Sequence, residues 1–465
     1  MRVLKFGGSS VADGERMAAV TGIIAEAARK DRVAVVLSAM KPVTDRLIAA
    51  ARLAEKGSEE LRPALETIRE QHFAAVRSLF PPTDQAAALT PLAVMCNELE
   101  EILHGVELVR ECSLRTLDLV MSFGERLSCR LAVSYMCSKG HKAVLVDARE
   151  IVRTDERFGS AAVDFPTSYH LIGERLAAVD GIAVIPGFIG STPSGVTTTL
   201  GRNGSDYTAS IIGAGAGAEV IEIWTDVDGV LSADPRLVPD AFVIPGITSE
   251  EAMELSYFGA KVIHPYTMVP AVEKDIPILI KNSLNPSAPG TLIADASRIT
   301  RDGGRPITGI ASIEGICLVN IEGGGMMGIP GFAARIFSAL AREGINIIMI
   351  SQASSEHTIC LVFRTVEGER ALAALNRELA PELATRRIER FELMCNLVVI
   401  SVIGENMHGT PGMAGRLFSS LGRAGVNILV IAQGSSERNI SFVIEEKSHT
   451  LALCTIHAEF LGTRA

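Results

Sequence analysis

Two short stretches of this chain combine glycines with charged side chains and hydroxyls. The first is KFGGSS, residues 5–10, which directly follows the apolar residues Val3 and Leu4. Backbone amides in a Gly-Gly turn between a strand and a helix can approach phosphate oxygens closely, and a lysine adds a point charge. The stretch therefore predicts either a phosphate site around Lys5 or a plain tight connection between strand and helix.

The second stretch is TTTLGRNGSDYTAS, residues 197–210, which stands between a β-like run and a helix rich in small residues. Arg202 suits planar recognition of a carboxylate or a phosphate. The alternative is a helix N-cap at Ser205 or Asp206 beside a solvated arginine. Taken alone, the stretch does not decide between these two interpretations.

Two further clusters carry charges in turn-rich surroundings. WTDVDGVLSADPR, residues 224–236, is compatible with a nucleotide or Mg²⁺ role and equally with structural Asp-Gly and Asp-Pro turns. SYFGAKVIHP, residues 256–265, places Lys261 after Phe-Gly-Ala and so resembles the first stretch.

The composition narrows the classes of partner. The chain has 465 residues and a formal net charge of −10, so we expect no nucleic-acid partner. No apolar run is long enough to cross a bilayer and the first residues lack a signal-peptide core, so we expect no membrane partner and a cytoplasmic location. Cysteines and histidines stand at no metal-ligand spacing, so we expect free thiols and no protein-bound metal.

These stretches need a scaffold, and the pattern up to residue 295 indicates one. Short β-rich runs alternate with longer amphipathic stretches, which predicts an α/β domain with a mainly parallel sheet sandwiched by helices. The runs are VAVVLS (33–38), KAVLVDA (142–148), GIAVIPGFIG (181–190), EVIEIWTDV (219–227) and IPILIKN (276–282).

Beyond a charged break at residues 296–309 the chain repeats itself. Residues 330–363 align without gaps on residues 411–444. Each copy reads as half or more of a β-α-β-β-α-β unit, so we predict two related ferredoxin-like domains rather than a solenoid.

Seven motifs in this order resemble the aspartate kinases of the amino-acid kinase family, above all the kinase half of the enzymes fused to homoserine dehydrogenase. The motifs are KFGGSS, VLSAMKPVTD, SFGERLS, RTDERFG, TTTLGRNGSDYTA, WTDVDGVLSADPR and ELSYFGAKVIHP. The repeat resembles a pair of ACT domains, small ligand-sensing folds that associate between subunits. The resemblance implies a kinase domain at 1–295, a linker at 296–309, and ACT domains at 310–390 and 391–465, with C-terminal residues as candidates to complete the first ACT domain.

The resemblance implies the transfer of a phosphoryl group from ATP, with Mg²⁺ bound to the nucleotide, to the side-chain carboxylate of L-aspartate. This would be the first step toward threonine, methionine and lysine. A carboxylate with a pKa of about 3.9 is already deprotonated at neutral pH, so it needs no general base. Catalysis then consists of positioning and of charge neutralisation at the phosphoryl group, which fits a site rich in Lys, Gly and Ser.

The family pattern also implies roles for individual residues. Lys5, Asp206 and Lys261 would be catalytic, with Asp206 ordering Lys5 or the substrate. The nucleotide would lie along Lys5, Phe6, Gly7, Gly8, Ser9, Thr225, Asp226, Leu231, Arg236, Lys261 and Val262. Aspartate would be held by Ser38, Thr44, Glu125, Arg202, Asn203, Gly204 and Ser205, with Arg202 on its α-carboxylate and Glu125 on its ammonium.

Three residues depart from the family pattern. Ser9 replaces a threonine and keeps the hydroxyl. Asp45 stands where an asparagine is common and adds a negative charge near an anionic substrate. Leu231 replaces a tyrosine beside the nucleotide, so we expect an altered adenine or ribose contact.

For the ACT pair the resemblance implies an amino-acid feedback inhibitor, threonine rather than lysine, and a homo-oligomer. Its contacts would be Asn346, Gln352, Asn427 and Gln433, which occupy matching positions of the repeat; without the resemblance these polar residues could simply end strands. Two other functions stay open: a catalytically inactive amino-acid sensor, and a related kinase with another carboxylate acceptor such as N-acetylglutamate. The charges of Lys5, Arg202, Asp206 and Lys261 argue against the sensor. The pair of Glu125 and Arg202 favours an acceptor with a free amine.

Overall fold

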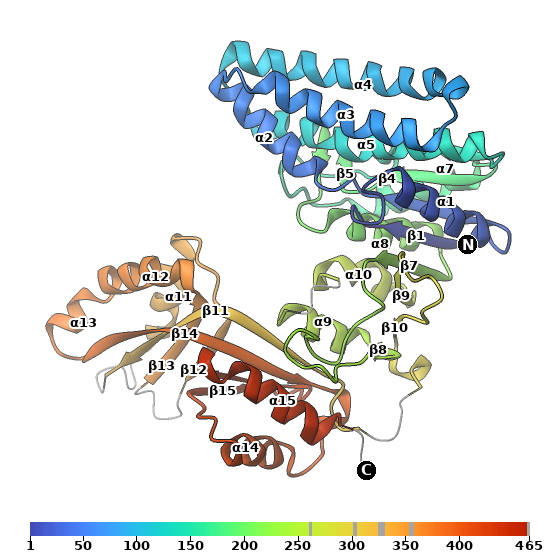
Figure 1. The fold of residues 1–465 in the computed structure, drawn as a ribbon. Coiled ribbons are helices and arrows are strands. Elements are labelled where there is room, and N and C mark those ends of the chain that lie inside the picture. Colours follow the sequence, from blue (N-terminus) through green and yellow to red (C-terminus); the bar gives the residue numbers. More distant parts are fainter. Residues whose placement is uncertain (260–262, 301–304, 324–330, 353–357, 463–465) are drawn as a thin grey trace. The chain divides into compact units, whose positions relative to one another are not determined.

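The computed structural model describes residues 1–259, 263–300, 305–323, 331–352 and 358–462. The chain forms two compact units, and each is described by itself (Figure 1). The first comprises Met1–Val230, Val243–Ser249 and Val262–Thr300, and the second Leu231–Phe242, Glu250–Lys261 and Arg301–Ala465. Two short segments that the sequence-based limits assign to the kinase domain thus group with the second unit.

The first unit is built on an eight-stranded sheet with the order β3-β4-β2-β1-β7-β9-β10-β8. Neighbouring strands are parallel except β9 and β10. The expected mainly parallel sheet is therefore confirmed. Its strands are β1 (Arg2–Phe6), β2 (Val33–Leu37), β3 (Ala143–Leu145), β4 (Ile182–Pro186), β7 (Val220–Thr225), β8 (Gly246–Thr248), β9 (Ile278–Asn282) and β10 (Thr291–Ala294).

Helices cover both faces of this sheet because successive strand residues point to opposite sides. On one face, Leu4 and Phe6 of β1 join a core with α1 and α5, and α2, α3 and α4 extend that layer (Figure 1). On the other face α8 contacts β1 and β7, and α7 and α10 pack on α8. These helices are α1 (Gly14–Ala28), α2 (Val43–Lys56), α3 (Leu61–Leu79), α4 (Pro82–Val109), α5 (Leu114–Ser138), α7 (Phe165–Ala177), α8 (Gly204–Ala216) and α10 (Pro265–Glu273).

A two-stranded hairpin lies outside the main sheet. Its antiparallel strands are β5 (Ile189–Ser191) and β6 (Thr197–Thr199), and the short helix α6 (Ala148–Ile151) contacts β5. The hairpin leads directly into the loop before α8.

The second unit contains a six-stranded antiparallel sheet with the order β12-β13-β11-β14-β16-β15. The strands β11 (Gly309–Glu322) and β14 (Arg390–Ile403) pair along their length and belong to both copies of the repeat. The other strands are β12 (Met349–Gln352), β13 (Thr358–Arg364), β15 (Val430–Gln433) and β16 (Asn439–Glu445).

Each copy of the repeat has its own apolar core. Phe332 and Ile336 of the first copy lie against α12, whereas Leu417 and Leu421 of the second lie against α15. The C-terminal helix thus packs with the second copy. The remaining helices of this unit are α9 (Ser249–Tyr257), whose first residue falls in the first unit, α11 (Phe332–Arg342), α12 (Thr365–Glu378), α13 (Ala380–Ala384), α14 (Met413–Arg423) and α15 (His449–Phe460).

Within the described ranges, no helix is long and apolar enough to cross a membrane.

Candidate active site

A cavity of about 490 Å³ opens at the carboxyl ends of β1 and β2, next to the start of α8. Ligands of open parallel sheets bind at this edge, where several strands end together. Eleven of the residues expected from the sequence line it: Lys5, Gly7, Gly8, Ser38, Thr44, Glu125, Arg202, Asn203, Gly204, Ser205 and Asp206.

Lys5 and Asp206 form an ion pair at the cavity wall. The alternation along β1 turns Leu4 and Phe6 toward α1 and α5, so Lys5 points to the face covered by α8. Its Nζ lies 2.6 Å from Oδ1 of Asp206, and each residue is only 8% exposed. A buried pair of this kind fixes the position of the ammonium group before a ligand arrives.

The Gly-Gly turn after β1 packs closely against the loop after β2. A Cβ atom on Gly8 would lie 2.7 Å from the Ala39 carbonyl oxygen, so a side chain does not fit there. The backbone of Lys41 donates a hydrogen bond to the Gly8 carbonyl at 3.2 Å, which ties the β1 turn to the loop after β2. Backbone atoms, the Lys5 ammonium and Lys41 therefore line this part of the cavity.

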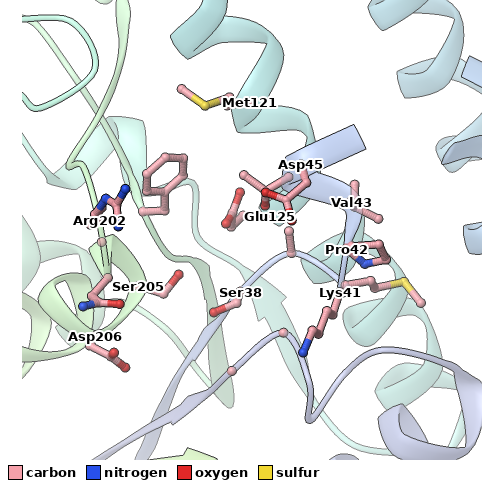
Figure 2. A pocket seen from close by; sticks show the side chains of 18 of the residues that line it. Ser38, Lys41, Pro42, Val43, Asp45, Met121, Glu125, Arg202, Ser205 and Asp206 are labelled. Carbon is pink, nitrogen blue, oxygen red and sulfur yellow. The ribbon is translucent and has the colours of Figure 1, made fainter. Parts of the chain in front are cut away.

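The start of α8 forms a second wall. Asn203 adopts a left-handed conformation with φ of 56°, and a Cβ atom on Gly204 would lie 2.6 Å from the Phe188 ring. The first residues of a helix present free N–H groups and the positive end of its dipole, which favours an anion. Figure 2 shows Arg202, Ser205 and Asp206 together on this side.

Glu125 is a carboxylate held in apolar surroundings. It is 3% exposed, and no hydrogen bond from the described part of the chain reaches its Oε2. Burial raises the pKa of Glu125 to about 8, although backbone hydrogen bonds from Ala39 and Glu125 itself act in the opposite direction. Glu125 lies between the Arg202 side of the cavity and the Asp45 side (Figure 2).

The cavity thus places a cation and an ionisable carboxyl group on separate elements. Arg202 on the loop before α8 can donate hydrogen bonds to a carboxylate, and the ionised form of Glu125 on α5 can accept them from an ammonium group. An amino-acid zwitterion carries both groups. The Lys5 ammonium and the glycine turn remain available to a phosphoryl group.

Several residues that the sequence predicts to contact the nucleotide do not line this cavity. The Phe6 side chain is fully buried and stacks on Trp224 with 5.8 Å between ring centroids, so only its backbone can face a ligand. Arg236 is paired with Asp234. Lys261 and Val262 lie outside the described residues. The cavity lining also does not include Ser9, Thr225 and Asp226 of the first unit. Leu231 and Arg236 belong to the second unit.

The four candidate regulatory residues lie in the second unit. Gln352 and Gln433 end the outer strands β12 and β15, paired with Ile359 and Ile440 respectively. Asn346 and Asn427 precede these strands at matching positions, and all four residues are exposed.

Some lining residues were not expected from the sequence. Met121 stands one helical turn before Glu125 on α5, and Phe188 stands two residues after the end of β4, as Gly8 does after β1. Their spacing is the signal that could have found them, because i and i+4 share a helix face and parallel strands end at one edge. Gly159 reaches the cavity from a loop and ends the motif RTDERFG, residues 153–159, which is the signal that could have found it.

The described residues contain no group of three or more His, Cys, Asp or Glu side chains placed to hold a metal ion. Mg²⁺ is commonly bound through substrate phosphates together with one or two carboxylates. The donor set of this cavity fits an ion that arrives on a nucleotide.

Comparisons with known proteins agree with this geometry. Residues 1–282 match the amino acid kinase family, and residues 319–379 and 400–460 match the ACT domain. Bifunctional aspartokinase/homoserine dehydrogenase 1 of Arabidopsis thaliana is 36% identical over 99% of this chain and 51% of its own length. Thus the chain spans about half the length of such relatives.

Two other relatives match along most or all of their length. Aspartokinase 1 of Arabidopsis thaliana is 36% identical over 98% of this chain and 80% of its own. The structure of E. coli aspartokinase III in complex with aspartate and ADP superposes with a TM-score of 0.80 at 31% identity, covering 99% of this chain and 100% of that one. The chain therefore belongs to the amino acid kinase family, among the aspartate kinases that carry ACT domains.

Proposed function

We propose that this protein transfers a phosphoryl group from ATP to the side-chain carboxylate of L-aspartate, giving 4-phospho-L-aspartate. The observation that carries the proposal is the cavity in which the Lys5–Asp206 pair stands beside a glycine turn, with Glu125 and Arg202 on separate walls. The aspartate and ADP bound by E. coli aspartokinase III support it.

In this proposal the protein catalyses by positioning and by electrostatics. Arg202 and Glu125 hold the α-carboxylate and the ammonium group. The ionised side-chain carboxylate attacks the γ-phosphorus of ATP, and the bond from that phosphorus to the bridging oxygen breaks to release ADP. Lys5, held by Asp206, neutralises charge on the transferring group, while Ser205 and the α8 start add N–H donors. Mg²⁺ bound to ATP supplies further charge neutralisation.

The test is an acyl-phosphate assay. ATP, Mg²⁺ and hydroxylamine are incubated with L-aspartate or with N-acetylglutamate, and both ADP and hydroxamate are measured. Aspartate-dependent hydroxamate supports the proposal. Hydroxamate formed only with N-acetylglutamate would assign another acceptor, and tight aspartate binding without turnover would indicate an inactive amino-acid sensor.

The ACT pair is proposed to bind a feedback inhibitor, L-threonine rather than L-lysine. Support comes from Gln352 and Gln433, which end outer strands at equivalent positions and present exposed side-chain amides. E. coli aspartokinase III has a structure with lysine and aspartate, so lysine belongs in the same assay. Suppression of hydroxamate by threonine alone would support the proposed inhibitor.

Self-association through the ACT pair is proposed as well. Ile350 and Ile431 are each 45% exposed and occupy the same position of β12 and β15. The Ser351 hydroxyl on β12 donates to the Ile431 carbonyl oxygen at 3.0 Å, so these outer strands approach each other and form one surface. Apolar side chains on outer strands favour pairing with another copy. The cytoplasmic location expected from the sequence also remains a proposal.

A further inference from the structure

A fully buried carboxylate, Asp118, lies next to the aspartate side of the cavity but does not line it. It stands on the same α5 face as Met121 and Glu125, and its residue exposure is 0%. In the described chain no ion pair involves Asp118. Burying a carboxylate without a cation is costly, so its hydrogen bonds have to compensate.

Its partners come from two distant segments. Oδ2 accepts hydrogen bonds from the backbone N–H of Gly159 at 3.0 Å and from that of Thr199 at 2.9 Å. Oδ1 accepts from the Thr199 hydroxyl at 2.7 Å and from Gly159 N–H at 3.1 Å. Asp118 therefore joins α5, the loop around Gly159 and the end of β6.

Both segments lead to the proposed substrate residues. The Ala161 N–H donates to the Thr199 carbonyl at 2.9 Å, and a Cβ atom on Gly201 would lie 3.2 Å from the Ser160 hydroxyl. Arg202 follows Thr199 by three positions. The segment that ends at Arg202 is thus fixed on one side by Asp118 and on the other by Gly204 against Phe188.

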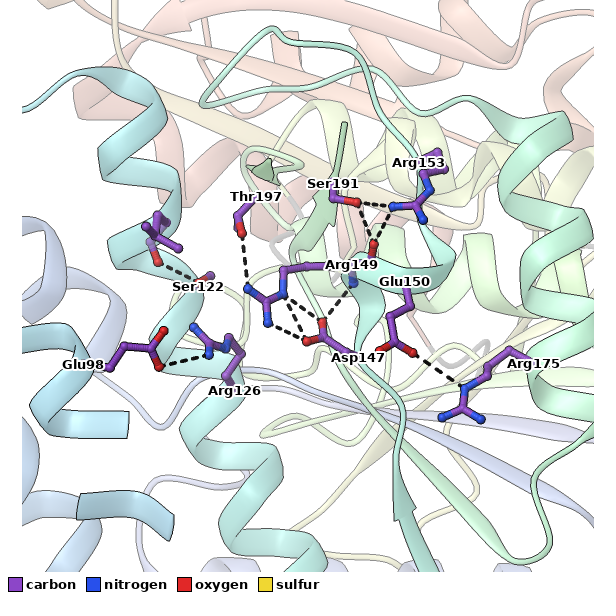
Figure 3. A network of polar contacts seen from close by, with 11 residues as sticks. Glu98, Ser122, Arg126, Asp147, Arg149, Glu150, Arg153, Arg175, Ser191 and Thr197 are labelled. Atoms are coloured by element: carbon purple, nitrogen blue, oxygen red, sulfur yellow. Dashed lines mark hydrogen bonds and ion pairs between the residues drawn. The ribbon is translucent and has the colours of Figure 1, made fainter. Parts of the chain in front are cut away.

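The far end of the hairpin is fastened separately, as Figure 3 shows. Arg149 donates to the Thr197 hydroxyl at 3.3 Å and is held by Asp147, and Arg153 bonds to the Ser191 hydroxyl. These contacts secure the hairpin without touching the Thr199 end. Among the hydrogen bonds of the described residues, those of Asp118 connect that end to the helix that carries Glu125.

We propose that Asp118 is a positioning residue for the substrate carboxylate: it sets the distance between Arg202 and Glu125 by fastening Thr199 and Gly159 to α5. The proposal rests on the proposed function of this cavity. Displacing one charged contact by even 1 Å weakens binding of a zwitterion that must meet both groups, whereas the nucleotide contacts of Lys5 stay in place.

The sharpest test uses two neighbouring threonines with the same burial. Thr199→Val removes the hydroxyl that bonds to Asp118, whereas Thr198→Val removes a hydroxyl bonded to the Thr154 hydroxyl, also at 2.7 Å. Both residues are 0% exposed. We expect Thr199→Val to raise the KM for aspartate about fivefold and Thr198→Val to leave it within about twofold, with the KM for ATP unchanged in both.

Variants of Asp118 itself give a graded series. Asp118→Ala removes every acceptor, and we expect the KM for aspartate to rise about 30-fold with a smaller effect on kcat. Asp118→Asn keeps one oxygen for the two backbone donors, and its amide can donate to the Thr199 hydroxyl, so it should rescue most of the loss. If Asp118→Ala does not fold, the KM values of Asp118→Asn, Thr199→Val and Thr198→Val still test the proposal.

Backbone amide hydrogen exchange over residues 199–205 provides a readout besides activity. It should accelerate in Asp118→Ala and Thr199→Val, but not in Thr198→Val. Equal KM shifts for the two threonine variants, or unchanged exchange in Thr199→Val, would overturn the proposal. If the unaltered protein turns over no aspartate, the proposed function fails, while the exchange data still decide whether Asp118 holds this segment.

Discussion

Three ionisable side chains in the cavity of the first unit are enclosed, whereas the polar side chains that end the outer strands of the second unit are exposed, as is Arg202 of the cavity lining. Lys5 and Asp206 are each 8% exposed and paired, and Glu125 is 3% exposed. Gln352 and Gln433 instead stand exposed at strand ends. Side chains fixed by burial lose little further entropy on binding, whereas exposed amides have to be ordered by whatever covers them.

This difference predicts different responses to substitution. In the cavity, removing one member of the Lys5–Asp206 pair leaves the other buried and unpaired, so the effect on catalysis should be large. On the outer strands, removing an amide costs nothing within a single chain, so its effect should be small and visible only with a bound effector. The expected effects on activity therefore decrease from the enclosed charges of the cavity to the exposed amides of the outer strands.

The largest effect is expected for Lys5. Replacement of its ammonium by an apolar side chain, Lys5→Met, should lower kcat by about 10³-fold or more, because charge on the transferring phosphoryl group is no longer neutralised. Steady-state ADP release with saturating aspartate measures this fall in kcat.

Lys5→Met also leaves Asp206 unpaired, so the free energy of unfolding should fall by about 3–5 kcal/mol. Lys5→Met combined with Asp206→Asn should recover stability but not activity. Arg2→Met is the control, since Arg2 on the same strand pairs with Asp31 and Glu222 at the opposite end. Normal turnover by Lys5→Met would rule out its assignment to the phosphoryl group.

A smaller loss is expected for Glu125, which acts on substrate binding. Glu125→Gln should raise the KM for aspartate about 10- to 100-fold, because a charge-assisted contact to the ammonium group is replaced by a neutral one. The KM for ATP should not change. A variant that binds aspartate normally would show that the ammonium group is held elsewhere.

The same residue predicts a pH dependence. With a pKa of about 8 in the ligand-free protein, Glu125 is protonated at pH 7, and aspartate binding requires its charged form. Aspartate affinity should therefore increase between about pH 7 and pH 9. Isothermal titration at several pH values tests this, and Glu125→Gln should remove the dependence.

Glu125 affects folding stability in the opposite direction: its contribution decreases as pH rises. Since folding raises the pKa of Glu125 from 4.5 to about 8, the folded state binds the proton more tightly, and its contribution to stability is lost as pH rises between these values. The slope is at most about 1.4 kcal/mol per pH unit. Denaturant unfolding of the original protein and Glu125→Gln at pH 5 and pH 8 isolates this contribution.

Much of this architecture could be predicted from the sequence. Alternating β-rich runs identified the parallel sheet, and the glycine-containing stretches at 5–10 and 197–210 identified both walls of the cavity. These features are local: a buried strand must be apolar, and a close backbone approach requires glycine.

Long-range polar contacts could not be predicted in this way. Asp118 bonds to groups 41 and 81 residues away, and nothing in its neighbours LRTLDLV marks it as a junction. Likewise Ser232 bonds to His457, 225 residues along the chain, which helps to explain why Leu231–Phe242 groups with the second unit. A single polar residue in an apolar helix face reveals its partner only after folding.

The smallest effect is expected for the equivalent glutamines Gln352 and Gln433. It shows which copy of the repeat binds the effector. Gln433→Ala and Gln352→Ala should each leave uninhibited kcat and KM unchanged, because both side chains are exposed and far along the chain from the cavity residues. Each should weaken threonine inhibition by about two- to tenfold, the value of one neutral hydrogen bond. Equal shifts in the two variants would mean that both copies bind the effector, while a shift in one alone would assign the site to that copy. Inhibition curves with threonine and with lysine measure this, and a fall in uninhibited kcat in either variant would contradict the division between enclosed catalytic charges and exposed regulatory amides.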